Sequence, residues 1–151
     1  MKALIIYDSL FGNTEKIARS MGNALGYQKD IEVLRVGQVK PEQLTGLELL
    51  IVGSPTQGGR PTQAVQDFLN QVSKPVVKGT NVAAFDTRLT TKWVEIFGYA
   101  AGRIAESLKR NGGMLIAPPE GFFVKGRKGP LQKGELERAA GWAKVIIERK
   151  R

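Results

Sequence analysis

Short apolar runs alternate with segments of helical spacing along this chain of 151 residues, and no other feature limits its fold as strongly. The apolar runs lie at residues 2–7, 49–53, 82–85 and 114–117, and a weaker one includes Ile31, Val33 and Val36. Runs that are apolar almost throughout are typical of strands covered on both faces, as in parallel sheets. The segments between them carry apolar residues three and four positions apart, which indicates helices with one buried face.

This alternation predicts one α/β domain over residues 1–151, in which a doubly wound five-stranded parallel sheet lies between two layers of helices. The long helices are expected at about 13–25, 65–72, 97–108 and 136–147, and a short, weak one at 40–44. The expected inner face of the last helix consists of Leu136, Ala140, Ala143 and Ile147. Pro118 and Pro119 interrupt the fifth strand, and residues 122–124 resume an extended segment.

Long loops follow the first, third and fourth expected strands, at Ser9–Thr14, Ser54–Pro61 and Asp86–Trp93. Ligands of doubly wound sheets bind beyond the carboxyl ends of the strands, where the strand order reverses. We therefore expect the three loops to converge at one edge of the sheet and to form a binding site there.

The loop Ser9–Thr14 joins the first strand to the first helix and is rich in hydroxyl, amide and glycine residues. A helix start leaves backbone N–H groups without partners and carries a partial positive charge, and Gly12 lets the backbone approach a ligand closely. The alternative is a polar turn that only caps the helix, but this composition favours a phosphate site. Neither the nucleoside-triphosphate loop nor the Gly-x-Gly-x-x-Gly fingerprint is present, so we expect a phosphate monoester at the end of a larger ligand.

The absence of two residue types excludes several kinds of catalysis, since the chain has no cysteine and no histidine. Thiolate chemistry and mechanisms with a histidine base are ruled out, and no cluster of carboxylates suggests a metal site.

The net charge of +9 favours anionic ligands or acidic partner proteins. No run is long enough to span a membrane and no signal-peptide pattern is visible, so we expect a cytoplasmic protein.

Three segments resemble those of the flavodoxin family, and the resemblance covers almost the whole chain. Ser9–Thr14 is similar to the loop that holds the phosphate of FMN, Leu50–Thr56 to the third strand and the loop flanking the flavin ring, and Phe85–Leu108 to the segment covering the other ring face. The resemblance implies a flavodoxin-like sheet of order 2-1-3-4-5 with FMN as cofactor. The FMN-binding residues that it implies are Ser9, Leu10, Phe11, Gly12, Asn13, Thr14, Ser54, Pro55, Thr56, Gln57, Gly58, Gly59, Asp86, Thr87, Arg88 and Trp93.

The chain also departs from the family pattern. Gln57 stands where many flavodoxins have an aromatic residue that stacks on the flavin, and the loop after the fourth strand lacks the usual Gly-Asp. Trp93 is the residue expected to stack on the ring instead. Flavodoxins are typically acidic, whereas this chain is basic, and Arg60, Arg88 and Lys92 predict a positive rim around the ring.

The resemblance implies an FMN-binding electron-transfer protein that shuttles single electrons between redox partner proteins, and the basic charge predicts acidic docking surfaces on those partners. An alternative is an FMN-dependent NAD(P)H:quinone-type reductase, since Gln57, Gly58 and Gly59 would leave the ring more open to a substrate. A third function, a non-redox module that binds nucleic acid, is not favoured, because basic and aromatic residues are not interleaved as in single-strand binders.

Overall fold

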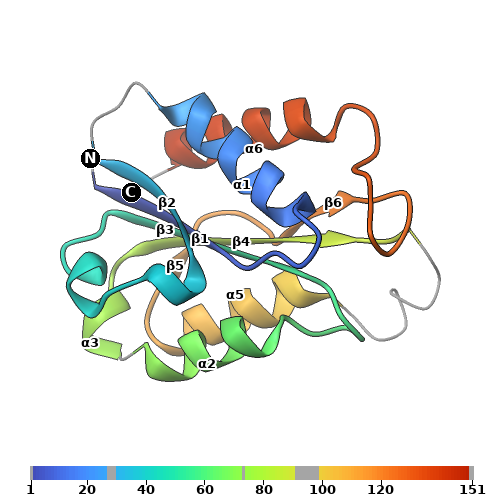
Figure 1. The fold of residues 1–151 in the computed structure, drawn as a ribbon. Helices are drawn as coiled ribbons and strands as arrows, with labels where there is room; N and C mark the ends of the chain where they lie inside the picture. The colour runs from blue at the N-terminus through green and yellow to red at the C-terminus, as the bar shows by residue number, and fades with distance from the viewer. Residues whose placement is uncertain (1, 27–29, 73, 91–98, 150–151) are drawn as a thin grey trace.

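The structure, a computed structural model, describes residues 2–26, 30–72, 74–90 and 99–149 and consists of a parallel sheet flanked by helices (Figure 1). The strands are β1 (Ala3–Tyr7), β2 (Ile31–Arg35), β3 (Leu49–Pro55), β4 (Asn81–Arg88), β5 (Met114–Leu115) and β6 (Glu120–Phe123). The helices are α1 (Asn13–Leu25), α2 (Gln63–Gln71), α3 (Lys74–Val77), α5 (Ala100–Arg110) and α6 (Glu135–Arg149). Two short 3₁₀ helices follow β2, at Val36–Gln38 and Pro41–Leu44.

The strands pair in the order β2-β1-β3-β4-β5, and every one of these pairs is parallel. This arrangement confirms the doubly wound sheet and the expected order 2-1-3-4-5. Strand β6 also pairs in parallel with β4, so β5 and β6 occupy the outer position as one interrupted strand. Pro118 and Pro119 lie in the interruption. Since proline has no N–H to donate, these residues break the hydrogen-bond ladder between β5 and β6.

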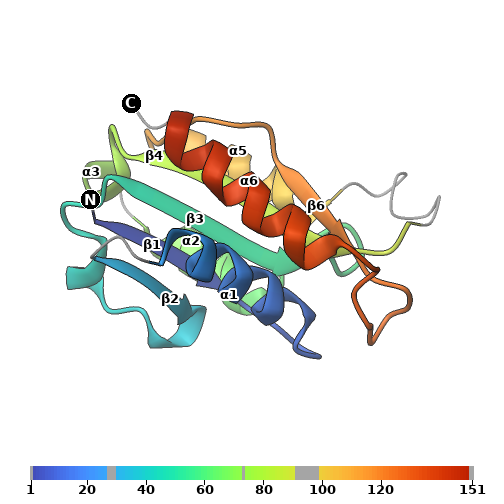
Figure 2. The ribbon, with the colours of Figure 1, turned by 90° about the horizontal axis from the view of Figure 1, so that it is seen from above.

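Helices cover both faces of the sheet, with α1 and α6 on one face and α2, α3 and α5 on the other (Figures 1 and 2). The side chains of Leu4 and Ile6 in β1 join the cluster under α2 and α5, whereas Ile5 and Tyr7 join the cluster under α1 and α6. Successive side chains of a strand point to opposite faces, so a strand covered on both faces must be apolar throughout. This is why the apolar runs predicted the strands.

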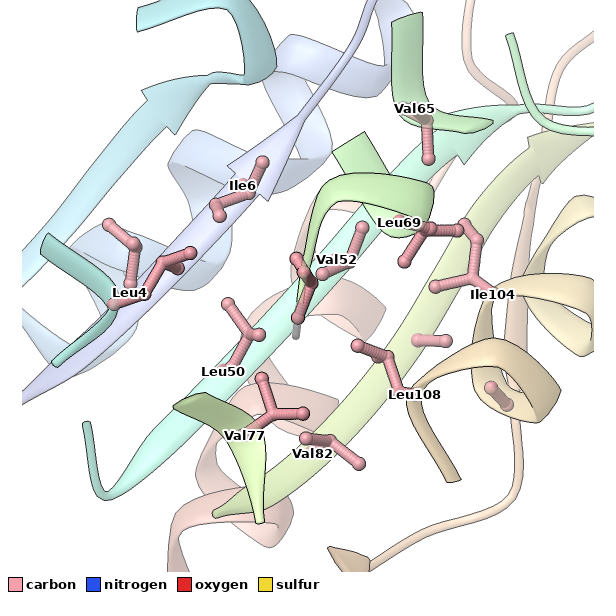
Figure 3. Packing of buried hydrophobic residues seen from close by; sticks show 14 of the residues in the cluster. Leu4, Ile6, Leu50, Val52, Val65, Leu69, Val77, Val82, Ile104 and Leu108 are labelled. Carbon is pink, nitrogen blue, oxygen red and sulfur yellow. The ribbon is translucent and has the colours of Figure 1, made fainter. Parts of the chain in front are cut away.

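The cluster beneath α2 and α5 is built from branched aliphatic side chains (Figure 3). Leu50 and Val52 of β3 are completely buried there, as are Ile104 and Leu108 of α5. Burying one such side chain contributes about 1.5–3 kcal/mol. The cluster therefore fixes both helices on the sheet and, with them, the loops at their ends.

Strand β4 is longer than the sequence predicted. We expected a loop from Asp86 onward, but Asp86, Thr87 and Arg88 continue the strand. All three pair with β6, and Asp86 and Thr87 also pair with β3 on the other side. Ladder partners on both sides extend the strand through three polar residues, which apolar patterning alone does not reveal.

The buried face of α6 differs from the predicted face, which began at Leu136. Leu136 is 40% exposed, and Glu135 is buried instead. The carboxylate of Glu135 accepts hydrogen bonds from Phe123 N–H at 2.7 Å and from Arg138 Nε at 2.9 Å, so a charged residue turns inward. The buried residues of α6 are Glu135, Ala139, Ala143 and Ile146.

The carboxyl ends of β1, β3, β4 and β6 lie at the same edge of the sheet. In the register, Tyr7 pairs with Gly53, and Thr87 pairs with both Pro55 and Phe122. The β1–α1, β3–α2 and β6–α6 loops therefore start or pass at this edge, together with the end of β4.

Candidate functional site

A cavity of about 570 Å³ opens at the carboxyl edge of the sheet, within the range of roughly 300–1,000 Å³ that is common for ligand pockets. Its walls come from the β1–α1 loop, the β3–α2 loop, the end of β4 and the β6–α6 loop. Among the described residues, no carboxylate side chain lines it. The lining residues are Ser9, Leu10, Phe11, Asn13, Thr14, Pro55, Thr56, Gln57, Gly58, Gly59, Thr87, Arg88, Leu89, Val124 and Arg127.

The β1–α1 loop presents hydrogen-bond donors to this cavity. Gly12 precedes α1 with a φ of 90°, a conformation that favours glycine. The hydroxyl oxygen of Ser9 accepts hydrogen bonds from Gly12 N–H at 3.1 Å and from Glu15 N–H at 3.3 Å. Within the described part of the chain, the N–H groups of Leu10, Phe11, Asn13 and Thr14 have no acceptor. These N–H groups, at the positive end of a 13-residue helix, are suited to an anion.

Two buried hydroxyl groups lie behind this loop. Thr14 Oγ1 and Thr87 Oγ1 are 2.8 Å apart and share a hydrogen bond. The two hydroxyls carry two hydrogens, and their mutual bond uses one of them. One hydrogen is therefore left to donate to a ligand in the cavity.

The loop is held from behind by a polar network that sequence reasoning missed. Arg35 of β2 donates from Nη1 to Ser9 O at 2.9 Å and to Asp8 Oδ1 at 3.3 Å. Asp8 Oδ2 accepts the hydroxyl hydrogen of Thr62 at 2.5 Å. Asp8 itself does not line the cavity. Arg35 thus ties β2 to the β1–α1 loop, and only the pairing of β1 with β2 brings these residues together.

The β3–α2 loop contains a tight turn at Gln57–Arg60. The N–H of each end residue donates to the carbonyl of the other, at 2.9 and 3.0 Å. Gly58 and Gly59 have φ values of 55° and 78°, and two positive φ angles are typical of two-residue hairpin turns. Both glycines are required by this turn, which forms one wall of the cavity.

Asp86 and Arg88 form a buried ion pair at the end of β4. Arg88 Nε and Nη2 donate to the Asp86 carboxylate at 2.7 and 2.9 Å, and Asp86 also accepts Ala101 N–H at the start of α5. The Arg88 guanidinium lies 3.4 Å from the ring centroid of Tyr99. Arg88 is therefore not the free rim charge that we expected.

Of the other two predicted rim charges, Arg60 is not at this rim and Lys92 is not tested. Arg60 lines a different pocket, between α2 and α5. Lys92 lies outside the described residues, as do Trp93 and Phe97. The expected stacking by Trp93 stays a prediction.

The β6–α6 loop is a wall that the sequence did not predict. Val124 and Arg127 line the cavity, and Asn13 Nδ2 donates to Lys128 O at 3.2 Å. A Cβ atom on Gly129, whose φ is 102°, would lie 2.7 Å from the Asn13 amide. The loop therefore packs directly on the start of α1. One indication of this position was present in the sequence. The basic loop at 125–130 follows the extended segment 122–124, and the carboxyl end of that segment is expected at the binding edge.

Glu135 and Arg138 anchor the far end of this loop. The hydrogen bond from Arg138, the Phe123 N–H and the positive charge of Arg138 together lower the pKa of Glu135, although burial opposes the shift. Arg138 also pairs with Glu120 at 2.9 Å. These contacts fix the start of α6 against β6.

Comparison with known proteins shows the family to which this chain belongs. The family model described as flavodoxin matches residues 5–142. This chain belongs to the flavodoxin family. Members of that family bind flavin, which agrees with a donor-rich loop beside a cavity whose described lining includes no carboxylate.

Individual flavodoxins are similar to the chain in sequence or in fold. "Probable flavodoxin 1" of Bacillus subtilis is 33% identical over 86 residues, which are 56% of this chain and 54% of that protein, so the match spans about half of the relative. Flavodoxin 2 of Bacillus cereus is 25% identical, with a TM-score of 0.81 and 99% of both chains covered. A flavodoxin from the domain Archaea, at 23% identity, has a TM-score of 0.82 with both chains fully covered.

Most residues that the resemblance to flavodoxins singled out do lie together around the cavity. Of the fifteen that the structure describes, three do not line it: Gly12 shapes the β1–α1 loop, Ser54 Oγ accepts Thr62 N–H at 3.0 Å, and Asp86 holds Arg88 and α5. Leu89, Val124 and Arg127 line the cavity although the sequence did not indicate them.

The described part of this flavodoxin contains no group of three or more His, Cys, Asp or Glu residues that could hold a metal ion. None of its described helices is both long enough and apolar enough to cross a membrane.

Proposed function

We propose that this chain binds FMN in the cavity and carries single electrons between redox partner proteins. The observation that supports this most directly is the set of N–H groups at Leu10, Phe11, Asn13 and Thr14, which have no acceptor among the described residues and lie beside a cavity whose described lining has no carboxylate. The oxygens of a phosphate monoester are mainly acceptors at neutral pH, so a loop rich in donors suits it.

The residues present fit FMN in their chemistry. The N–H groups of the β1–α1 loop and the hydroxyl groups of Ser9 and Thr14 would hold the phosphate. The turn at Gln57–Arg60 would bound one side of the ring, and Leu89 and Val124 supply apolar wall. Bound FMN would supply the redox chemistry, for which the protein needs no acid or base of its own.

The protein surface would select the partners. The chain carries 23 Lys and Arg residues against 14 Asp and Glu residues, so acidic surfaces are the expected docking sites. Complementary charge mainly raises the rate at which two proteins meet.

The experiment that tests FMN binding is a titration of the purified protein. Protein freed of any ligand should bind FMN with a stoichiometry of one and turn yellow, and it should bind riboflavin much more weakly, because riboflavin leaves the donor loop without an anion. A protein that remains colourless and binds neither compound contradicts the proposal. Equal affinities for FMN and riboflavin would contradict the role of the loop.

A second candidate function is an FMN-dependent NAD(P)H:quinone-type reductase. Gln57 is exposed, lines the cavity and belongs to a turn without an aromatic residue, so this turn offers no ring to cover the flavin. An uncovered ring face would admit a nicotinamide or a quinone. Steady-state oxidation of NAD(P)H by a quinone, with FMN-loaded protein and no partner protein, separates the reductase from the carrier.

A further inference from the structure

A second pocket, of about 250 Å³, lies between α2 and α5, on the sheet face opposite α1 and α6 (Figure 1). Three arginines line it, namely Arg60 from the turn of the β3–α2 loop and Arg103 and Arg110 from α5. Ser107 of α5 also lines it. Residues 103, 107 and 110 are four and three positions apart, so they share one stripe of the helix.

Within the described ranges, the three arginines of this pocket have no acidic side chain paired with them. No described carboxylate lines the pocket either. The nearby acids on the two helices have other partners. Asp67 accepts a hydrogen bond from Gln63 at 2.8 Å, and Glu106 lies 3.9 Å from Lys109. Like charges that line one small pocket repel each other, so an anion between them would be favoured.

Arg103 is partly oriented in advance. Its Nε donates to the carbonyl of Gly59 at 2.9 Å, while its two terminal amino groups have no partner in the described part of the chain. Gly59 is itself fixed in the tight turn, so the guanidinium is anchored on one side and free to bind on the other. A planar guanidinium with two free amino groups matches the oxygens of an oxyanion in a bidentate manner.

We propose that this pocket is an anion site for a phosphate-type oxyanion, separate from the FMN cavity. Three guanidinium groups suit an anion with three or more oxygens and a charge of about two better than a planar monocarboxylate. The volume of about 250 Å³ is below the usual range for whole organic ligands, so the pocket takes the phosphate group and leaves the rest of any larger molecule outside.

The test is isothermal titration calorimetry with inorganic pyrophosphate and the full-length protein loaded with FMN, at constant ionic strength set with sodium chloride. The parent should bind one pyrophosphate, and Arg110→Gln should weaken the binding by about tenfold or more, because hydrogen bonds to a charged group are lost. Lys144→Gln, an exposed position on α6 with the same change in charge, should leave the affinity unchanged. Arg110 is exposed, so its variant is expected to fold normally.

The outcomes are distinct. If Arg110→Gln and Lys144→Gln bind pyrophosphate equally well, or if acetate competes as strongly as pyrophosphate, the site is not the one proposed. Tighter binding of ADP than of pyrophosphate would support the site and assign its anion to a nucleotide, whereas equal binding would support it and assign an inorganic anion. Retention of FMN by all variants separates a failure here from a failure of FMN binding.

Discussion

Replacing Thr14 with valine removes one hydroxyl group from the cavity and keeps the branched shape of the side chain. Thr14 is 1% exposed, and its Oγ1 lies 2.8 Å from Thr87 Oγ1. Thr14 belongs to the first turn of α1, beside the unpaired N–H groups, whereas Thr87 belongs to β4 behind it. We therefore expect Thr14 to donate its hydrogen to the phosphate and Thr87 to donate its own hydrogen to Thr14 Oγ1.

The size of the effect follows from this geometry. Loss of a hydrogen bond to a charged group costs about 1.5–3 kcal/mol, which corresponds to a rise of roughly 10- to 150-fold in the dissociation constant of FMN. The ligand-free protein should also lose about 1–3 kcal/mol of unfolding free energy, because the buried Thr87 hydroxyl loses its partner. In Thr87→Val, Thr14 keeps its hydrogen, so the affinity for FMN should change only a few-fold.

Quenching of flavin fluorescence gives these affinities directly. Riboflavin is the internal control, since Thr14→Val should not alter its affinity if the hydroxyl contacts only the phosphate. Thr45→Val, at an exposed position in a distant loop, controls for substitution as such. The reasoning is refuted if Thr14→Val binds FMN like the parent, or if Thr87→Val loses as much affinity as Thr14→Val.

Three further predictions concern the ion pairs and the surface charge. Arg88→Met leaves the fully buried Asp86 carboxylate unpaired and should lower the unfolding free energy by about 3–5 kcal/mol in urea denaturation; an unchanged midpoint would contradict the pairing. The pKa of Glu135 is lowered in the folded state, so its stabilisation is present above the unfolded pKa of about 4.3 and is lost as the pH falls through the folded pKa. The stability gap between the parent and Glu135→Gln should thus be constant above about pH 5 and shrink below it, and a gap that widens in acid would refute this. Association with an acidic redox partner, followed by stopped flow, should slow as salt rises, and a rate independent of salt would exclude the basic surface as the docking face.

The sheet could be predicted from the sequence because both of its faces are covered. Strands such as β1, and β3 up to Gly53, are then apolar at almost every position, and runs of this length bounded by turn residues are typical of buried parallel strands. The β1–α1 loop was predictable for a related reason. A backbone with φ of 90° favours glycine, so Gly12 directly before a helix predicts a tight turn with a positive φ at that position.

The features that the sequence did not predict are the end of β4, the buried face of α6 and the place of Val124, and each depends on contacts between residues distant in the chain. Asp86 and Arg88 are typical of a loop in composition, yet they extend β4 because each satisfies the charge of the other and β3 and β6 supply ladder partners. Glu135 is buried for the same reason, through Arg138 and Phe123 N–H, and this moved the buried face of α6. Val124 entered the site because an interrupted edge strand brings it to the cavity.

The net charge of +9 does not set the charge of the cavity. Arg88 lies 2.7 Å from Asp86, so the pair contributes little net potential, and Arg60 faces another pocket. Arg127 is the charged lining residue that has no ion pair within the described part of the chain. One unit charge at ~8 Å and an effective dielectric constant of ~20–40 contributes about 1–2 kcal/mol to the binding of an anionic group. Among the described residues, the electrostatic character of the site therefore depends mainly on Arg127 and on the N–H groups of the β1–α1 loop.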